Sequence, residues 1–249
     1  MALTDKLREL AEASLTFLYP DVCQVCRSAR ATAAEGYVCT GCWRNVRFIV
    51  PPMCDRCGSP FEGEISDRFE CANCRELDLA FSNARSSVAA KGMVLDIIHR
   101  WKYGRSLWFE PFLANLLVRE AAPALREGTW HGIIPVPLHP AKQAEREFNQ
   151  AEHLAARLSQ ETGIPLQTKW LRRVNPTLTQ TRLSRAERAK NMQDAFAAAA
   201  QADAIRGKRL IVVDDVLTTG ATTSACAAVL RACGATEVCV WTVARGLLD

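Results

Sequence analysis

Four Cys-x-x-Cys pairs near the start of the chain constrain its fold more than any other feature. A Cys-x-x-Cys turn directs two thiolates toward one point, and two such turns complete a tetrahedral Zn²⁺ site with only protein ligands. The spacing therefore predicts two structural zinc sites in tandem, a double zinc ribbon. A cross-braced pairing uses the same residues, and disulfides or iron–sulfur clusters are further alternatives. The eight cysteines are Cys23, Cys26, Cys39, Cys42, Cys54, Cys57, Cys71 and Cys74.

Metal binding is expected to supply much of the folding energy of this cysteine-rich segment. Little apolar sequence lies between Leu10 and Leu79 from which a core could be built. A structural zinc site supplies on the order of 10–16 kcal/mol in small zinc domains, so chelation should unfold the segment. The other three cysteines, Cys226, Cys233 and Cys239, lie in apolar patterns and are expected to be buried as small hydrophobic side chains.

The composition predicts a globular protein with one large domain and a small addition. The chain has 249 residues, of which 49% are hydrophobic and 23% are charged. No apolar run is long enough to span a bilayer. Residues 1–20 have leucines at helical spacing, while Asp5, Glu9 and Glu12 interrupt any signal-peptide core. We expect an amphipathic helix packed on the domain in a cytoplasmic protein, with partner docking or membrane-surface binding as the alternatives.

The charge of the N-terminal segment argues against a general DNA-binding clamp. Residues 1–76 contain nine Lys or Arg and eleven Asp or Glu, and zinc-bound thiolates add more negative charge. DNA-binding surfaces concentrate positive charge. A scaffold role or a contact with another protein is therefore the favoured interpretation.

The rest of the chain has the pattern of an α/β domain with a parallel sheet. Short, continuously apolar runs alternate with amphipathic segments, as in sheets that helices cover on both faces. We expect helices over 93–103, 106–121 and 148–163, and strands over 132–138, 166–171, 210–216 and 237–243.

The segment DDVLTTGAT predicts a site for a phosphorylated sugar. Its two aspartates, Asp214 and Asp215, follow a buried strand, and ligands of open α/β sheets bind beyond the carboxyl ends of strands. The Thr- and Gly-containing turn then starts a helix, whose N–H groups are suited to a phosphate dianion. A cis-diol on the carboxylates and a phosphate in the turn together match ribose 5-phosphate. A merely capped helix would explain one of these residues, and the P-loop and Rossmann motifs are absent.

The same segment resembles the phosphoribosyl pyrophosphate (PRPP) motif of type I phosphoribosyltransferases. Other segments resemble the ComF family of competence proteins, and the resemblance covers essentially the whole chain. It implies a helix over 1–20, a double zinc ribbon over 21–78 and a phosphoribosyltransferase-like α/β domain with a parallel sheet over 79–249. The matching segments are PVPLHP (135–140), REFNQAEHLA (146–155), TQTRLSRAERAKNMQDAF (179–196) and a Lys102-Tyr103-Gly104 signature expected to border the cleft.

The resemblance also implies roles for the residues of the turn. Asp214 and Asp215 would bind the ribose hydroxyls, directly or through Mg²⁺, and are candidate catalytic residues. The 5-phosphate would be held by Thr218, Thr219, Gly220, Ala221 and Thr222.

By the same resemblance, the loop after the strand HGIIPVPLHP (131–140) corresponds to the pyrophosphate loop of the family. Leu138 and His139 would lie near the diphosphate, and Lys142 and Arg146 would neutralise it. Glu147 departs from the family pattern, which has glycine there. A carboxylate would repel pyrophosphate, so either Glu147 turns away or this contact is weakened.

A basic stretch from Thr168 to Asn191 contains seven Lys or Arg and only Glu187 as an acid. A solvated helix face is the ordinary interpretation of such a run. The resemblance instead implies a mobile loop that closes over the diphosphate, with Arg188 as a candidate catalytic residue. A third interpretation is that this stretch binds single-stranded DNA, with Trp170 as a stacking face. The cations of the loop are Arg182, Arg185, Arg188 and Lys190.

Two functions follow from these observations. The first is a PRPP-binding protein that acts in the internalisation or processing of transforming DNA and contacts other competence proteins through its zinc ribbon. The second is an active phosphoribosyltransferase of nucleotide metabolism that transfers ribose 5-phosphate to an unidentified nitrogen acceptor. Because this chemistry depends on electrostatic positioning, binding and catalytic sites look alike in sequence. No acceptor-binding element is recognisable, which favours the first.

Overall fold

The computed structural model describes residues 21–64, 67–175, 195–198 and 202–247. The predicted N-terminal helix over 1–20 lies outside these residues. So do Arg182, Arg185, Arg188 and Lys190, and with them the proposed roles of the basic loop.

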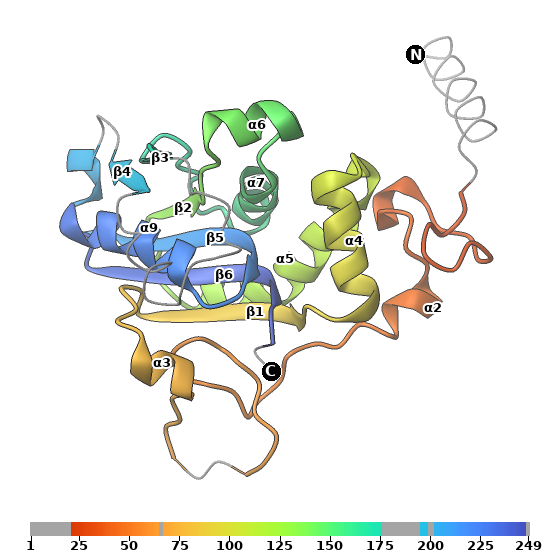
Figure 1. Cartoon of the computed structure of the whole chain (residues 1–249), viewed down its shortest axis with the longest axis horizontal. Coiled ribbons are helices and arrows are strands. Elements are labelled where there is room, and N and C mark those ends of the chain that lie inside the picture. The colour runs from red at the N-terminus through yellow and green to blue at the C-terminus, as the bar shows by residue number, and fades with distance from the viewer. Residues whose placement is uncertain (1–20, 65–66, 176–194, 199–201, 248–249) are drawn as a thin grey trace.

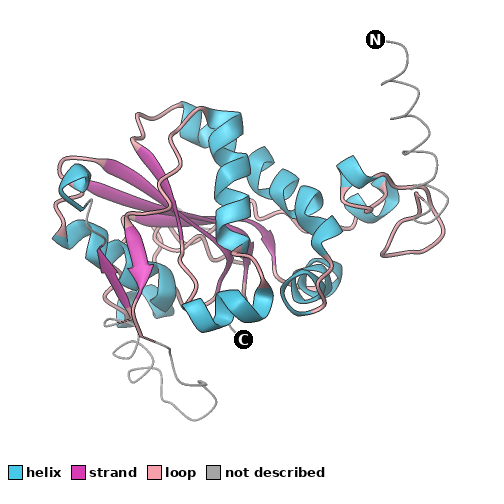
Figure 2. Ribbon diagram, turned by 90° about the horizontal axis from the view of Figure 1, so that it is seen from above, coloured by secondary structure: helices cyan, strands magenta, loops and turns pink. Residues whose placement is uncertain are grey.

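A parallel four-stranded sheet forms the centre of the molecule, with the strand order β1-β6-β5-β2. Helices cover both faces, as Figures 1 and 2 show. The predicted α/β class with a parallel sheet is therefore confirmed. The strands are β1 (Asn83–Ala89), β2 (Gly132–Pro135), β5 (Arg209–Leu217) and β6 (Glu237–Arg245).

Two layers of helices enclose the sheet. One face packs against long helices whose buried positions recur at helical spacing, and the other face packs against a helix of small residues. On the first face lie α4 (Gly92–Tyr103), α5 (Glu110–Arg126) and α7 (Gln150–Thr162), and on the second lies α9 (Ala221–Ala232).

Short elements complete the domain. A two-stranded antiparallel sheet stands beside α9, and a short helix follows β2. These elements are η2 (Leu107–Phe109), α6 (Pro140–Arg146), β3 (Leu171–Arg173), β4 (Phe196–Ala198) and η4 (Ala202–Ile205), and the cysteine-rich segment contains η1 (Ala33–Glu35), α2 (Thr40–Trp43) and α3 (Ala72–Glu76).

The strands differ from the predictions in extent, and one strand was not predicted. The strand predicted over 132–138 is β2, which ends at Pro135. Strand β5 does not stop at the two aspartates but continues to Leu217. The predicted strand over 166–171 forms only an isolated bridge from Leu166 to Ile133, and the ladder residues begin at Leu171. Strand β1 was not predicted, because its sequence NARSSVA lacks a long apolar run. It is buried nonetheless, since the sheet and the cysteine-rich segment cover its small side chains.

The two cysteine-rich halves lie on different parts of the α/β domain and do not pack as one module. Figure 1 shows α2 beside α4 and α5, whereas α3 lies below the other end of the sheet. The Trp43 ring packs edge-on against Phe112 of α5, with 5.2 Å between the ring centroids. The second half joins the opposite hydrophobic cluster, together with Leu79 and Phe81. Both halves therefore share a core with the domain, and metal is not their only source of stability.

The segment that connects the halves runs along the free edge of the sheet. Ile49 N donates to Ser87 O at 3.0 Å, and Ala89 N donates to Arg47 O at 2.9 Å. These bonds satisfy backbone groups of β1 that would otherwise be open to solvent or to another chain. The cysteine-rich segment thus completes the sheet edge.

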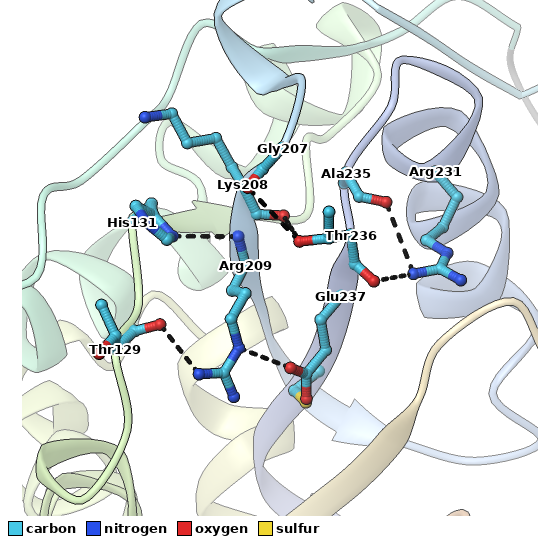
Figure 3. A network of polar contacts seen from close by, with 10 residues as sticks. Thr129, His131, Gly207, Lys208, Arg209, Arg231, Ala235, Thr236 and Glu237 are labelled. Carbon is cyan, nitrogen blue, oxygen red and sulfur yellow. Dashed lines mark hydrogen bonds and ion pairs between the residues drawn. The ribbon is translucent and has the colours of Figure 1, made fainter.

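A network of polar contacts surrounds the amino-terminal ends of β5 and β6 (Figure 3). Arg209 Nε lies 2.6 Å from Glu237 Oε2, and Arg209 N donates to His131 Nδ1 at 3.1 Å. These contacts hold the amino-terminal ends of the strands together. The candidate site lies at the carboxyl end of β5.

Among the described residues, no helix combines the length and the apolar character that crossing a membrane would require.

Candidate functional site

Asp214 and Asp215 lie within β5, near its carboxyl end, and point to opposite faces of the sheet. Successive side chains of a strand alternate between faces. Val213 packs in the cluster with α5 and α7, and Val212 packs in the cluster with α9. Asp215 therefore lies on the α4 and α5 face and Asp214 on the α9 face. A ligand can meet both carboxylates only over the end of the strand.

On the α4 and α5 face, Asp215 forms an ion pair with Lys102 of α4. The Lys102 Nζ lies 2.7 Å from Asp215 Oδ2, and both side chains are largely buried, with exposed fractions of 16% and 9%. A buried carboxylate needs such a partner, because desolvation otherwise opposes its charge. The pair orients Asp215 as a hydrogen-bond acceptor at the strand end.

Asp214 is electrostatically the more strained of the two carboxylates. Burial first, and then the charge of Asp215, raise the pKa of Asp214 to about 7, while Lys102 opposes the shift. Its Oδ1 accepts a hydrogen bond from Asp215 N at 2.9 Å. Arg173 also interacts with Asp214 electrostatically. The group is therefore suited to a cation or a hydroxyl donor.

The turn after β5 is shaped to receive an anion. Gly220 caps α9 with a φ of +87°, a left-handed conformation that favours glycine. Helix α9 then starts at Ala221, so the positive end of its dipole faces the turn. Thr223 Oγ1 donates to Gly220 O at 3.1 Å and fixes the first helical turn.

Backbone donors in this turn are free. Among the described residues, the N–H groups of Thr218, Thr219 and Gly220 donate to no other group, and Ala221 N has only Thr219 Oγ1 at 3.4 Å. Consecutive free N–H groups before a helix start form a typical phosphate-binding arrangement. The structure thus brings together the turn that the sequence predicted, next to Asp214 and Asp215.

On the predicted pyrophosphate side, His139 has a structural role that the sequence did not predict. It is the N-cap of α6, and its Nδ1 accepts a hydrogen bond from Ala141 N at 3.3 Å. Its neighbour Leu138 lines a pocket that Arg172 and Arg173 also line. The loop after β2 therefore faces the two-stranded sheet, beside the end of β5.

Three cations surround this region. The pKa of Lys142 is lowered, by burial first and then by the charges of Arg173 and Arg146. Arg146 Nη2 donates to Tyr103 Oη at 3.1 Å, and its guanidinium stacks over the Tyr103 ring. Arg173 interacts electrostatically with Asp214 and lies over the Phe196 ring. Cations close enough to depress each other's pKa values favour the arrival of an anion.

Glu147, the departure from the family pattern, turns away from this group. It has a φ of +68°, the left-handed conformation of a helix C-terminus, which explains why glycine suits the position. Its Oε1 lies 3.0 Å from Arg105 Nη2 in an exposed pair. The carboxylate is thus paired with a cation outside the site, and its repulsion of an anion is reduced.

The eight cysteines form two groups of four, and each group combines consecutive pairs of the sequence. One contains Cys23, Cys26, Cys39 and Cys42, and the other contains Cys54, Cys57, Cys71 and Cys74. Tetrahedral zinc with bonds of about 2.3 Å separates its sulfurs by about 3.8 Å. Sγ–Sγ distances of 3.6–3.8 Å within the two groups match this value. Both groups fit zinc, and the sequential pairing is the one observed.

The two cysteine clusters repeat one backbone design. Cys39 N donates to Cys23 Sγ at 3.3 Å, and Cys71 N donates to Cys54 Sγ at the same distance. Only the second cluster has an arginine donor among the described residues: Arg245 Nη2 donates to Cys57 Sγ at 3.4 Å. Hydrogen bonds to the thiolates of a metal site orient them and disperse their charge.

Sequence reasoning missed three residues of this region. Lys102 belongs to a signature that was expected only to border the cleft. Arg173 was one of seven cations in a basic stretch, without a role of its own. Arg245 ends the apolar strand β6, and a lone charged residue after such a run is the only signal that the sequence offers; the structure shows it to be 1% exposed.

Known proteins resemble this chain in sequence over most of its length. The family described as Double zinc ribbon domain matches residues 14–76. Competence protein F of Haemophilus influenzae is 32% identical over 230 residues, which cover 90% of this chain and 96% of that protein. DNA utilization protein YhgH of Escherichia coli K12 is 28% identical over 231 residues, covering 92% and 98%.

Solved structures overlap with parts of the chain. A purine phosphoribosyltransferase from Pyrococcus horikoshii is 20% identical, with a TM-score of 0.36, and covers 54% of this chain and 83% of its own. A glutamine PRPP amidotransferase from B. subtilis is 25% identical, with a TM-score of 0.34, and covers 51% and 24%.

Proposed function

The chain belongs to the competence protein F family, and we propose that it binds PRPP and acts in the internalisation or processing of transforming DNA. The proposed ligand site lies at the end of β5 and the start of α9. The fold assigned to the site, that of a type I phosphoribosyltransferase, rests on the DDVLTTGAT motif and on its position in a parallel sheet.

The observation that carries the proposal is the row of free backbone donors beside two carboxylates. Thr218, Thr219 and Gly220 present N–H groups that have no partner among the described residues. A phosphate dianion satisfies such donors and is favoured by the start of α9. Asp214 and Asp215 precede these donors along β5.

The diphosphate of PRPP brings further charge, which the surrounding cations match. Lys142, Arg146 and Arg173 would neutralise it on the side of α6 and β3. Magnesium, which accompanies PRPP, would add a divalent charge, and Asp214 is the carboxylate with the donor chemistry for it. Burial first, and then the charge of Asp215, raise the pKa of Asp214, and a divalent cation between the two carboxylates would offset their repulsion.

The cellular part of the proposal comes from the relatives. These relatives are competence protein F and DNA utilization protein YhgH, and nearly their whole length matches this chain. We extend to this chain a role in DNA uptake, with single-stranded DNA and other competence proteins as partners in the cytoplasm. The zinc ribbon is the proposed protein-contact element.

Calorimetric titration of Mg²⁺ and PRPP into the zinc-loaded protein tests ligand binding. We expect saturable binding that is lost in Asp214→Asn and Asp215→Asn and retained in Asp96→Asn, an exposed carboxylate of α4. Absence of binding to the unaltered protein would refute the PRPP site. Equal binding by all four proteins would place the ligand elsewhere.

A second candidate function is transfer of the ribose 5-phosphate to a nitrogen acceptor. The observation that favours it is the cation cluster, because a leaving diphosphate needs this neutralisation in the transition state. The test is release of pyrophosphate from PRPP in the presence of purine bases, pyrimidine bases or ammonia. Release that depends on one acceptor and is lost in Arg173→Met would establish the enzyme. Binding without release would leave a PRPP-responsive binding protein.

A further inference from the structure

The second cysteine cluster lies directly behind the proposed phosphate-binding turn. Arg245, the last residue of β6, donates from Nη2 to Cys57 Sγ at 3.4 Å and from Nη1 to Leu217 O at 2.9 Å. The same Nη1 also donates to Thr218 O. One buried guanidinium thus joins a zinc ligand to the backbone of the turn.

A second side chain of the cluster continues this row of contacts. Asn73, between Cys71 and Cys74, donates from Nδ2 to Thr219 O at 3.3 Å and is 7% exposed. The carbonyl groups of Leu217, Thr218 and Thr219 are therefore all bound from the side of the second cluster. They are consecutive carbonyls of the backbone.

These three carbonyl groups determine where the free donors of the turn point. Each carbonyl shares a planar, trans peptide unit with the N–H group of the next residue, and in such a unit C=O and N–H point in opposite directions. Fixing the carbonyls toward the cluster therefore directs the N–H groups of Thr218, Thr219 and Gly220 to the other side. Those are the N–H groups without a partner among the described residues.

The negative charge of a tetrathiolate zinc site makes it a suitable partner for the buried guanidinium of Arg245. Arg245 is 1% exposed, and among the described residues it forms no ion pair with a carboxylate. A buried cation requires a negative partner. A tetrathiolate zinc site has an excess of two negative charges, and Cys57 is its thiolate closest to the guanidinium.

Apolar packing and one more hydrogen bond reinforce the contact. A Cβ atom at Gly220 would meet Phe81 at 3.4 Å and Leu79 at 3.5 Å, so these side chains lie directly under the turn. Ala80 N donates to Ser224 Oγ of α9 at 2.9 Å. The first cluster has no such relation, because it packs beside α4 and α5, where Arg100 Nη1 donates to Gln24 O at 3.0 Å.

We propose that Arg245 and Asn73 are positioning residues, which use the second zinc site as a fixed support to aim the N–H groups of residues 218–220 at a phosphate. This inference rests on the proposed PRPP function for the identity of the ligand. It adds that occupancy of the second zinc site and affinity for PRPP are coupled, and that the first zinc site is not. Linkage requires the coupling to be reciprocal.

The first test is PRPP affinity in conservative variants. Arg245→Lys retains the charge but loses the planar fork, and Asn73→Ala loses the donor. We expect each to weaken PRPP binding by about tenfold, within the usual range of coupling between sites. Arg100→Lys, the matched arginine at the first half, should bind as the unaltered protein does. Zinc content and thermal unfolding verify that each variant is folded and loaded with two ions.

The second test follows the coupling in the opposite direction with a spectroscopic signal. Cobalt replaces zinc in tetrathiolate sites and gives thiolate-to-metal absorption bands. We expect PRPP to shift the bands of the second site in the otherwise unaltered protein and not in Arg245→Lys. Cys26→Ser, which removes a ligand of the first site, should leave this shift in place. A purely structural contribution of Arg245 would produce no ligand-dependent shift.

The third test does not require PRPP. Amide signals of Thr218, Thr219 and Gly220 in ¹H–¹⁵N spectra should change in Arg245→Lys and Asn73→Ala and stay in place in Arg100→Lys. If the unaltered protein fails to bind PRPP, the proposed function is wrong, and these signals alone decide the positioning inference. Unchanged amide signals in folded, two-zinc variants would overturn it, as would unchanged PRPP affinity.

Discussion

Lys102 Nζ of α4 lies 2.7 Å from Asp215 Oδ2 of β5, and this pair is almost fully removed from solvent. It joins a helix on one face of the sheet to the strand end where the ligand is proposed to bind. Asp214, on the other face, interacts electrostatically with Arg173. The two adjacent carboxylates therefore have different electrostatic environments and different expected responses to substitution.

We expect Lys102→Met to lower the free energy of unfolding by about 3–5 kcal/mol, because it leaves Asp215 buried and unpaired. The double variant Lys102→Met, Asp215→Asn should recover much of this loss. Urea unfolding at pH 7 measures both. Arg119→Met, which breaks an exposed pair with Glu120, is the matched control and should cost no more than about 1 kcal/mol. If the effects of Lys102→Met and Asp215→Asn simply add, the two side chains are not coupled.

Asp214→Asn should stabilise the ligand-free protein, and increasingly so as the pH rises. The pKa of Asp214 is raised to about 7 from 3.8, by burial first and then by the charge of Asp215. Between these values the folded protein retains a proton that the unfolded chain releases, so the free energy of unfolding falls with rising pH. Asparagine removes this fall.

Urea unfolding from pH 5.5 to 8.5 tests this prediction in a range where thiolates still bind zinc. The advantage of the variant should grow up to about pH 7 and level off above it. Asp96→Asn, at an exposed carboxylate, provides the baseline. Parallel pH profiles for Asp214→Asn and the unaltered protein would contradict the assignment of the raised pKa to Asp214.

Glu147→Gly should stabilise the protein by about 0.5–1 kcal/mol, because a left-handed φ strains a residue with a Cβ atom. The lost ion pair with Arg105 offsets little, since both side chains are exposed by more than 60%. Glu145→Gly, two residues earlier in α6, is the control and should destabilise by about 1 kcal/mol. A loss of stability in Glu147→Gly would mean that its pair with Arg105 outweighs the strain.

The sequence allowed the strand–turn–helix unit of the site to be predicted because its signals are local. The apolar run before Asp214 indicated a buried strand, and Gly220 with the following small residues indicated a turn and a helix. The end of β5 was predicted too early. Pairing with β6 extends the strand to Leu217, where the sequence alone suggested a turn.

Features that depend on contacts between distant segments could not be predicted. Nothing in the sequence near Arg245 indicates that it meets Cys57, which lies 188 residues earlier. The placement of the two ribbon halves on separate parts of the domain also depends on contacts between distant segments. One such contact is that of Trp43 with Phe112 of α5. Strand β1 was missed because its sequence NARSSVA lacks a long apolar run, and distant segments of the chain bury it. The domain boundary between residues 78 and 79 stays a prediction.

Zinc stoichiometry in double variants distinguishes the two pairings that the sequence left open. The unaltered protein should contain two zinc ions. Cys26→Ser with Cys42→Ser alters one cluster of the structure and should lose one ion, whereas Cys26→Ser with Cys57→Ser alters both and should lose two. In a cross-braced arrangement the results would be reversed, because Cys26 and Cys57 would then share an ion. Native mass spectrometry counts the ions directly, and thermal unfolding shows which loss the shared cores tolerate.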